Sequence, residues 1–196
     1  IKSLDQNHMV STGSEGYYGC EFDMDLFEKI HSCPDVDYLN MHIWPYNWKW
    51  VGKETLESGL DEAIAKTDKY IDAHIEVAER CGKPIVLEEF GWPRDGVSYS
   101  KEAPVTVKDR YYRYVLERVV KAKKEGSKLA GANFWGWGGY AEQTDGRVNW
   151  IPGDDYCCDP AHEPQGLYSV YLSDRSTIEV IMDVQKQLED VALSLK

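Results

Sequence analysis

Hydrophobic positions along the chain fall into short strand-like segments and longer stretches with helical spacing. Strands are predicted over residues 8–14, 36–44, 84–89 and 129–135, and the continuous apolar run at 84–87 predicts a strand buried on both faces. Apolar residues recur every three or four positions within 58–80, 107–124 and 176–190, which predicts amphipathic helices, and a shorter helix fits 23–32. The resulting order, β-α-β-α-β-α-β-α, indicates an α/β protein with a parallel sheet.

Two architectures fit this order. One is an open doubly wound sheet, and the other is part of an eight-stranded (β/α) barrel, which typically needs about 250 residues. No glycine-rich phosphate loop follows any predicted strand, which disfavours the nucleotide-binding doubly wound folds. The 196 residues suffice for a sizeable core, so we predict a single domain over 1–196.

The charge balance narrows the class of partner. The chain has 22 Lys and Arg against 34 Asp and Glu, a formal net charge of −12. Such a surface is unsuited to nucleic acid or to an anionic membrane surface, because phosphates require basic side chains. The sequence contains no apolar run of about 18 residues, so no membrane span is predicted. The five cysteines form no CxxC pair, so no zinc site is predicted.

Tryptophans gather at one end of the predicted sheet. All seven lie at or just after the carboxyl end of a predicted strand, and none lies on a predicted helix. Ligands of parallel α/β folds bind at that end. A tryptophan taken singly is as often a packing residue as a stacking one, so the prediction depends on their collective placement. Flat apolar surfaces gathered there predict a site for sugar rings, with carboxylates and amides bonding the hydroxyls.

The stretch KPIVLEEFGWPRDG, residues 83–96, ends a buried strand on two adjacent carboxylates. Successive side chains of a strand point to opposite faces. We therefore expect only one of Glu88 and Glu89 to reach a site at this strand end, with the other anchoring the strand by ionic or hydrogen bonds. The alternative is that both are solvated charges.

These segments resemble glycoside hydrolase family 5. KPIVLEEFG resembles the seventh barrel strand of that family, in which the Glu before Phe-Gly is the catalytic nucleophile, here Glu89. NMHIWPYNW resembles the sixth strand, which puts His42 near the nucleophile and Trp44 in the aromatic position beyond it. GANFWGWGG resembles the eighth strand, whose tryptophan floors the site, here Trp135.

Two further segments resemble the β-mannanase branch of the family: STGSEGYYG its fifth strand, and HEPQGLYSVYLSDRSTIEVI the run from the eighth-strand loop into the last helix. The resemblance covers nearly the whole chain in order. It implies a (β/α)8 TIM barrel, of which this chain holds the C-terminal half as four β-α units. It also implies a retaining hydrolase that cleaves β-1,4-mannan or glucomannan internally. The remaining candidate substrate-binding residues are Glu15, Trp48, Trp50, Trp92, Arg94 and His162.

One departure from the family pattern concerns the acid/base residue. In the family it is the Glu of an Asn-Glu pair that ends the fourth strand, and no Asn-Glu pair occurs in these 196 residues. We therefore expect this chain to carry the nucleophile half of the site and to be inactive alone. Its expected partner is the missing N-terminal half of the barrel or a second copy of itself. The resemblance implies no metal or cofactor, and a secreted, periplasmic or cell-surface protein.

Two other functions remain open from the sequence. One is a different family 5-like β-glycanase of the cellulase type, since mannan, glucomannan and cellulose differ at one ring hydroxyl. The other is a non-catalytic carbohydrate-binding domain. That function explains the tryptophans but not the alternation of strands and helices, because sugar-binding modules are mostly β-sandwiches.

Overall fold

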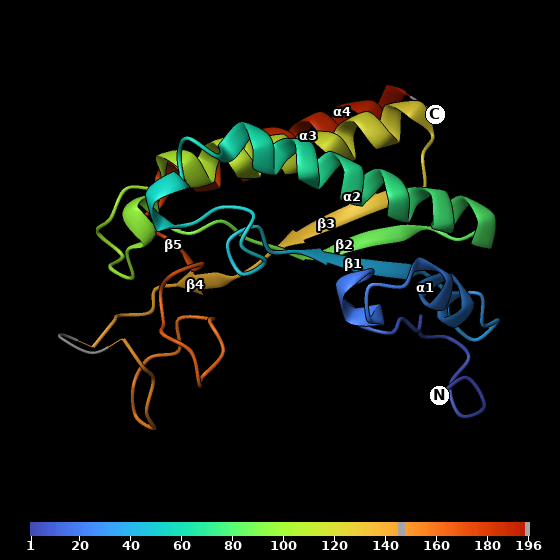
Figure 1. Ribbon diagram of the computed structural model, residues 1–196, viewed down its shortest axis with the longest axis horizontal. Coiled ribbons are helices and arrows are strands. Elements are labelled where there is room, and N and C mark those ends of the chain that lie inside the picture. The colour runs from blue at the N-terminus through green and yellow to red at the C-terminus, as the bar shows by residue number, and fades with distance from the viewer. Residues whose placement is uncertain (145–147, 195–196) are drawn as a thin grey trace.

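A three-stranded parallel sheet forms the centre of the computed structural model, which describes residues 1–144 and 148–194 (Figure 1). The strand order is β1-β2-β3, with β1 at Leu39–Ile43, β2 at Ile85–Phe90 and β3 at Leu129–Phe134. The predicted strands 36–44, 84–89 and 129–135 agree with these to within three residues at each end.

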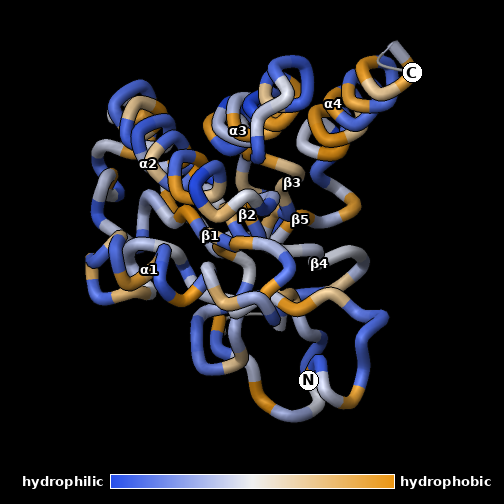
Figure 2. Tube along the Cα trace, turned by 90° about the vertical axis from the view of Figure 1, so that its right-hand side faces the viewer, coloured by the Kyte–Doolittle hydropathy of each residue, from blue (hydrophilic) through white to orange (hydrophobic). Residues whose placement is uncertain are grey.

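Helices separate the strands, as predicted: α1 is Met24–His31, α2 Leu60–Cys81, α3 Thr106–Glu125 and α4 Arg175–Ser194. Short 3-10 turns lie at Tyr18–Cys20, Lys53–Thr55 and Asp95–Val97. In two views at right angles α2, α3 and α4 lie in a row on one face of the sheet (Figures 1 and 2). A doubly wound sheet carries helices on both faces, so the described part of the chain excludes that alternative. One covered face is the arrangement of a sector of a (β/α) barrel.

The core lies between the sheet and these helices. Phe90 of β2 is fully buried, with its ring centroid 4.9 Å from that of Tyr112 on α3. The other fully buried apolar side chains of β1 and β2 are Leu39, Met41, Ile43, Ile85 and Leu87. Burial of each such side chain contributes about 1.5–3 kcal/mol, so the covered face holds the strand ends in place. Among the described residues, no helix is long and apolar enough to cross a bilayer.

The prediction of a strand over residues 8–14 is wrong. This segment runs beside β1 as irregular chain, bonded mainly through side chains. The Asn40 side-chain oxygen accepts from Ser11 Oγ at 2.7 Å and from Thr12 Oγ1 at 2.9 Å. Hydroxyls that bond locally compete with a backbone ladder, and Gly13 with φ +70° interrupts the extended conformation. The edge of β1 is thus covered, but not by a strand.

Two short strands beyond β3 were not predicted. β4 is Trp137–Gly139 and β5 is Val170–Tyr171, and they pair in parallel as a separate small sheet. With three and two residues, they are shorter than the runs from which a hydrophobic pattern predicts a strand. They fasten the segment before α4 to the chain that leaves β3.

Candidate active site

The carboxyl ends of β1, β2 and β3 line one pocket of about 300 Å³. Glu89 is the penultimate residue of β2, Trp44 directly follows β1, and Trp135 directly follows β3. We call these three residues the floor. The pocket is completed on one side by Pro160, Glu163 and Tyr168, which we call the wall, and elsewhere by Glu15, Asn47 and Trp48.

His42 lies between the two carboxylates of β2. Its Nδ1 is 3.2 Å from Glu89 Oε2, and its Nε2 is 3.9 Å from Glu88 Oε2. Strand alternation predicted that the two glutamates point apart. Instead both approach one ring, because the register of both ladders of β2 shifts here, as at a β-bulge. Glu88 also accepts a 2.9 Å bond from the Tyr38 hydroxyl, so it does anchor the strand end, and it does not line the pocket.

Burial sets the protonation of the pocket. It raises the pKa of Glu89, and the negative charges of Glu15 and Glu88 raise it further, while a hydrogen bond from Trp44 acts in the opposite direction. Burial likewise raises the pKa of Glu15. It lowers the pKa of His42 to about 4, so this ring is neutral at neutral pH. A neutral imidazole has a single N–H, so His42 can donate to only one of its two carboxylates at a time.

Three of the predicted tryptophans present rings to the pocket. Trp44 and Trp135 lie edge to face with centroids 6.2 Å apart. Trp48 stacks on Tyr18 at 3.9 Å with an interplanar angle of 9°. Trp50 does not line the pocket: its Nε1 donates to the Tyr18 hydroxyl at 3.1 Å, and its ring contacts Trp48 at 5.2 Å. It therefore supports the aromatic lining without belonging to it.

Two residues predicted at the rim are buried below it. Trp92 has no exposed surface, and its ring lies 4.6 Å from that of Tyr111 on α3. Arg94 also has none, and it forms a two-pronged ion pair with Asp174. The chain turns inward after β2, where a buried carboxylate and several carbonyl oxygens accept from both Nη atoms of the guanidinium. Neither residue is placed to touch a substrate, so both predictions are wrong.

His162, predicted at the rim, does not line the pocket. Its side chain is 83% exposed and lies 3.6 Å from the carboxylate of Glu163, which does line the pocket. Two further lining residues, Asn47 and Tyr168, were not predicted. Both lie inside segments that resemble the family, NMHIWPYNW and HEPQGLYSVYL. Their position in those segments is the signal that identifies them, because neither is a tryptophan or a carboxylate.

Tyr168 joins the wall to the other sides of the pocket. Its hydroxyl donates to the side-chain oxygen of Asn47, and its ring meets that of Trp44 edge to face at 4.9 Å. Gly91 lies where the two rings meet. A Cβ there would be 2.6 Å from Cζ3 of Trp44 and 2.8 Å from Cδ1 of Tyr168. Only glycine permits this approach, so floor and wall meet at a residue without a side chain.

The side chains that line the pocket are of the kinds that bind sugars. A partly buried carboxylate, a neutral imidazole and tryptophan faces suit a neutral, hydroxyl-rich ring. Over the ranges that the structure describes, no group of three or more His, Cys, Asp or Glu side chains is placed to hold a metal ion. Together with parallel strands covered on one face, these features define a protein of the (β/α)-barrel class with a pocket suited to a sugar ring.

The family follows from comparison with known proteins. Residues 1–192 match the family described as GH family 5 β-mannosidase-like, and the chain belongs to that family. Mannan endo-1,4-β-mannosidase 7 of Arabidopsis thaliana is 28% identical over 148 residues, which are 69% of this chain and 32% of the relative.

Solved structures show the same relation. The glycoside hydrolase family 5 mannosidase from Rhizomucor miehei superposes with a TM-score of 0.85 and 30% identity over 97% of this chain and 46% of its own. The hyperthermostable endo-1,4-β-D-mannanase from Thermotoga petrophila RKU-1 superposes with a TM-score of 0.56 and 26% identity. That match covers 98% of this chain and 48% of the mannanase. The chain thus spans about half the length of these structures. The predicted family is confirmed, and the chain has the architecture of half a (β/α)8 TIM barrel.

Proposed function

We propose that this chain carries the nucleophile half of the active site of a retaining hydrolase that cleaves β-1,4-mannan or glucomannan internally. The observation that carries the proposal is the position of Glu89. It lies near the carboxyl end of β2 beside neutral His42 and lines a pocket with Trp44 and Trp135. The name of the Arabidopsis thaliana relative supports mannan as the substrate, and a polysaccharide substrate favours a secreted or cell-surface protein.

In this mechanism Glu89 attacks the anomeric carbon and forms a covalent glycosyl–enzyme, which water then hydrolyses. His42 orients the carboxylate, and because its ring is neutral it leaves the negative charge available for attack. The faces of Trp44 and Trp135 hold the pyranose ring over Glu89, while Trp48 serves a neighbouring subsite.

A retaining mechanism needs a second carboxyl group about 5–5.5 Å from the nucleophile. We assign it to a residue outside this chain, in accord with the missing Asn-Glu pair. Loss of general acid catalysis costs about 10²–10⁴-fold, so residues 1–196 alone should turn over mannan negligibly. The competing assignment is Glu15, which lines the same pocket. Normal turnover of glucomannan by the isolated chain, abolished by Glu15→Gln, would favour Glu15.

Covalent trapping tests the nucleophile independently of the acid. A 2-deoxy-2-fluoro-β-mannosyl fluoride needs no protonation of its leaving group, since fluoride departs as an anion. The purified protein should be labelled on the peptide that contains Glu89, as read by mass spectrometry. Glu88→Gln is the matched control and should still be labelled. A label on any other carboxylate, or labelling of Glu89→Gln, would contradict the proposal.

A second candidate is exo-acting cleavage of β-mannosides. It is favoured by the closer superposition on the Rhizomucor miehei mannosidase, with a TM-score of 0.85 against 0.56 for the endo-mannanase. The lengths of early products from mannohexaose distinguish the two. Early release of mannobiose, mannotriose and mannotetraose indicates internal cleavage, whereas mannose together with mannopentaose indicates exo cleavage. Cellohexaose in parallel tests the cellulase alternative.

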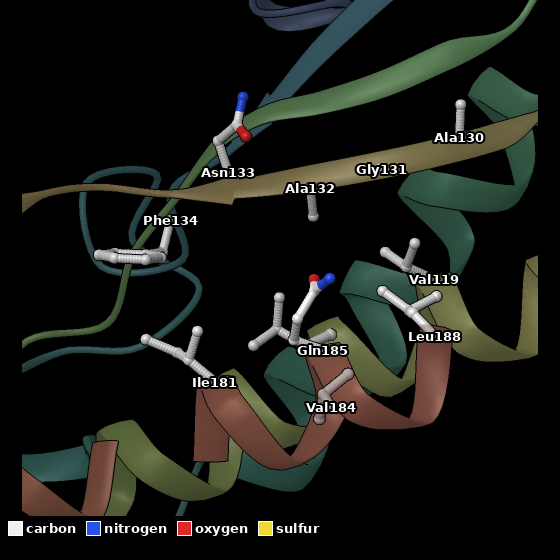
Figure 3. Close-up of a pocket in the computed structure, with 11 residues that line it drawn as sticks. Val119, Ala130, Gly131, Ala132, Asn133, Phe134, Ile181, Val184, Gln185 and Leu188 are labelled. Atoms are coloured by element: carbon white, nitrogen blue, oxygen red, sulfur yellow. The ribbon is translucent and has the colours of Figure 1, made fainter. Parts of the chain in front are cut away.

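The proposed partner occupies the open edge of β3. A groove of about 370 Å³ separates this edge strand from α3 and α4. Ile181, Gln185 and Leu188 of α4 project across it toward β3, where Ala132 projects toward them (Figure 3). Unpaired strand edges are templates for another strand. We propose that a parallel strand from the rest of the barrel fills this groove, because the solved relatives are about twice as long as the superposed part.

Light scattering on residues 1–196 tests the open edge. With the groove empty, the isolated chain should self-associate along β3, in which case a second copy substitutes for the proposed strand. A monodisperse monomer of 22.4 kDa with a cooperative melt would contradict the proposal, since such a species needs no partner.

A further inference from the structure

The wall of the pocket lies in a segment with almost no regular structure. Residues 157–171 contain only the two-residue strand β5. Pro160, Glu163 and Tyr168 of this segment nevertheless line the pocket at defined positions. Buried backbone carbonyl groups that lack a ladder need other donors, so the donors to this segment determine where the wall lies.

Two buried cations bond its carbonyl oxygens. Lys108 of α3 has no exposed surface, and its Nζ donates to the carbonyl oxygens of Tyr168 and Ser169, each at 3.1 Å. Nη2 of Arg94 donates to the Ser169 carbonyl oxygen at 3.3 Å. The backbone N–H of Arg94 donates to the Leu167 carbonyl oxygen at 3.2 Å. Three successive carbonyl oxygens are therefore held from below the pocket.

Two buried carboxylates balance this charge. Asp174 pairs with Arg94 through both carboxylate oxygens. Asp159 accepts from the Gly166 backbone N–H at 2.6 Å and from Ser169 Oγ at 3.2 Å. A buried charge without a partner would be strongly destabilising. Here two cations and two carboxylates enclose the same short segment, so the wall and the charge cluster form one unit.

A lysine at position 108 is not explained by stability alone. Replacing buried charges by apolar side chains of similar volume is often neutral or stabilising. Burial lowers the pKa of Lys108 to about 7, with Arg94 adding to the effect. A neutral amine still has two N–H groups, and two carbonyl oxygens accept from it. The bonds to Tyr168 and Ser169 therefore persist with or without the charge.

We propose that Lys108 and Arg94 are positioning residues for the substrate pocket. They fix the backbone at 167–169, and this fixes the Tyr168 ring against Trp44 and its hydroxyl on Asn47. Neither cation touches the pocket itself. The identity of the ligand rests on the proposed function, whereas the positioning of the segment does not.

Lys108→Met tests the first half of the inference, with Lys121→Met as the matched control because it lies on the same helix and its side chain is 57% exposed. Hydrogen exchange of the amides at 166–171 should accelerate at least about tenfold in Lys108→Met and not in Lys121→Met. Unchanged exchange there, or a uniform rise across the whole protein, overturns the inference. This measurement needs no ligand, so it decides the question even if the protein binds no mannan.

A double-mutant cycle tests the second half, by tryptophan-fluorescence titration with mannotetraose on the intact protein. Lys108→Met should weaken binding about tenfold, as expected for loss of one or two hydrogen bonds. In a Tyr168→Ala background the same change should have almost no effect, because the ring it positions is gone. Equal losses in both backgrounds would mean that Lys108 acts through general stability, and would overturn the inference. If Lys108→Met does not fold, Ser169→Ala removes the hydroxyl bonds to Asp159 and the Cys157 carbonyl oxygen and takes its place.

Discussion

The floor and the wall of the pocket are built in different ways. Glu89, Trp44 and Trp135 of the floor stand at the ends of neighbouring strands, where backbone ladders and a buried helix-covered face fix them. Tyr168 of the wall depends on side-chain donors such as Lys108, 60 residues away in the sequence. The floor is therefore a product of strand register, and the wall is a product of long-range polar contacts. The two should respond differently to mutation.

The largest expected effect falls on the floor. Glu89→Ala in the intact protein should lower kcat on mannan by at least about 10⁴-fold, as removal of a nucleophile does. Glu88→Ala should leave a readily measurable rate, because Glu88 bonds Tyr38 and does not line the pocket. Since both carboxylates approach His42, this pair of variants is a strict test. If Glu88→Ala is the inactive variant, the assigned register is wrong by one residue.

Trp135→Ala should have the next largest effect. Loss of an aromatic face that holds the sugar costs about 2–3 kcal/mol of binding, which is a decrease of about 30- to 150-fold in kcat/KM. Tyr140→Ala is the control, because that ring is 88% exposed and lies outside the pocket. Steady-state kinetics on glucomannan measure both. Equal effects of the two variants would remove Trp135 from the floor.

The pH profile of kcat/KM gives an intermediate effect. Glu89 attacks as a carboxylate and its pKa is raised, so the acid limb should lie above the ordinary value of 4.5. Glu15→Gln removes a negative charge that raises this pKa, so the limb should move to lower pH. Stability should change with pH in the opposite direction to activity. The folded state binds the Glu89 proton more tightly than the unfolded state, so the contribution of this carboxyl to the free energy of unfolding falls as pH rises through the raised pKa. An acid limb that is unmoved in Glu15→Gln would show that the two carboxylates do not interact.

The smallest effect should come from the wall. Tyr168→Phe removes the bond to Asn47 but keeps the ring against Trp44. One hydrogen bond contributes about 1 kcal/mol, so KM should rise about fivefold with kcat nearly unchanged. The exposed Tyr156 supplies the control variant Tyr156→Phe. A large loss of kcat in Tyr168→Phe would erase the distinction between floor and wall.

Sequence patterns predicted the three strands of the sheet because each is a short, mainly apolar segment that a helical pattern precedes or follows. They failed for residues 8–14, where hydroxyl side chains rather than a ladder bond the chain to Asn40. Glu89 was predictable because its position is local to the strand end. The direction of Glu88 was not, because a bulge depends on the pairing of two ladders and leaves no mark in one strand.

Residues after the strands were harder to assign. Trp92 and Arg94 follow β2 directly, and nothing local shows that the chain there turns inward toward Tyr111 and Asp174. The place of Tyr168 in the pocket was not predicted for the same reason, because the groups that position it come from α3 and from the loop after β2. Such positions are set by partners distant in sequence, which a single-chain pattern does not contain.

Gly91 bears on how this pocket can evolve. Because Trp44 and Tyr168 both occupy the space that a side chain at 91 would take, any substitution there moves the two rings at once. We therefore expect substitutions at position 91 to be tolerated less than substitutions at the neighbouring positions. New substrate preferences have to arise at other residues that line the pocket, such as Glu15 or Glu163, whose side chains do not occupy the space beside Gly91.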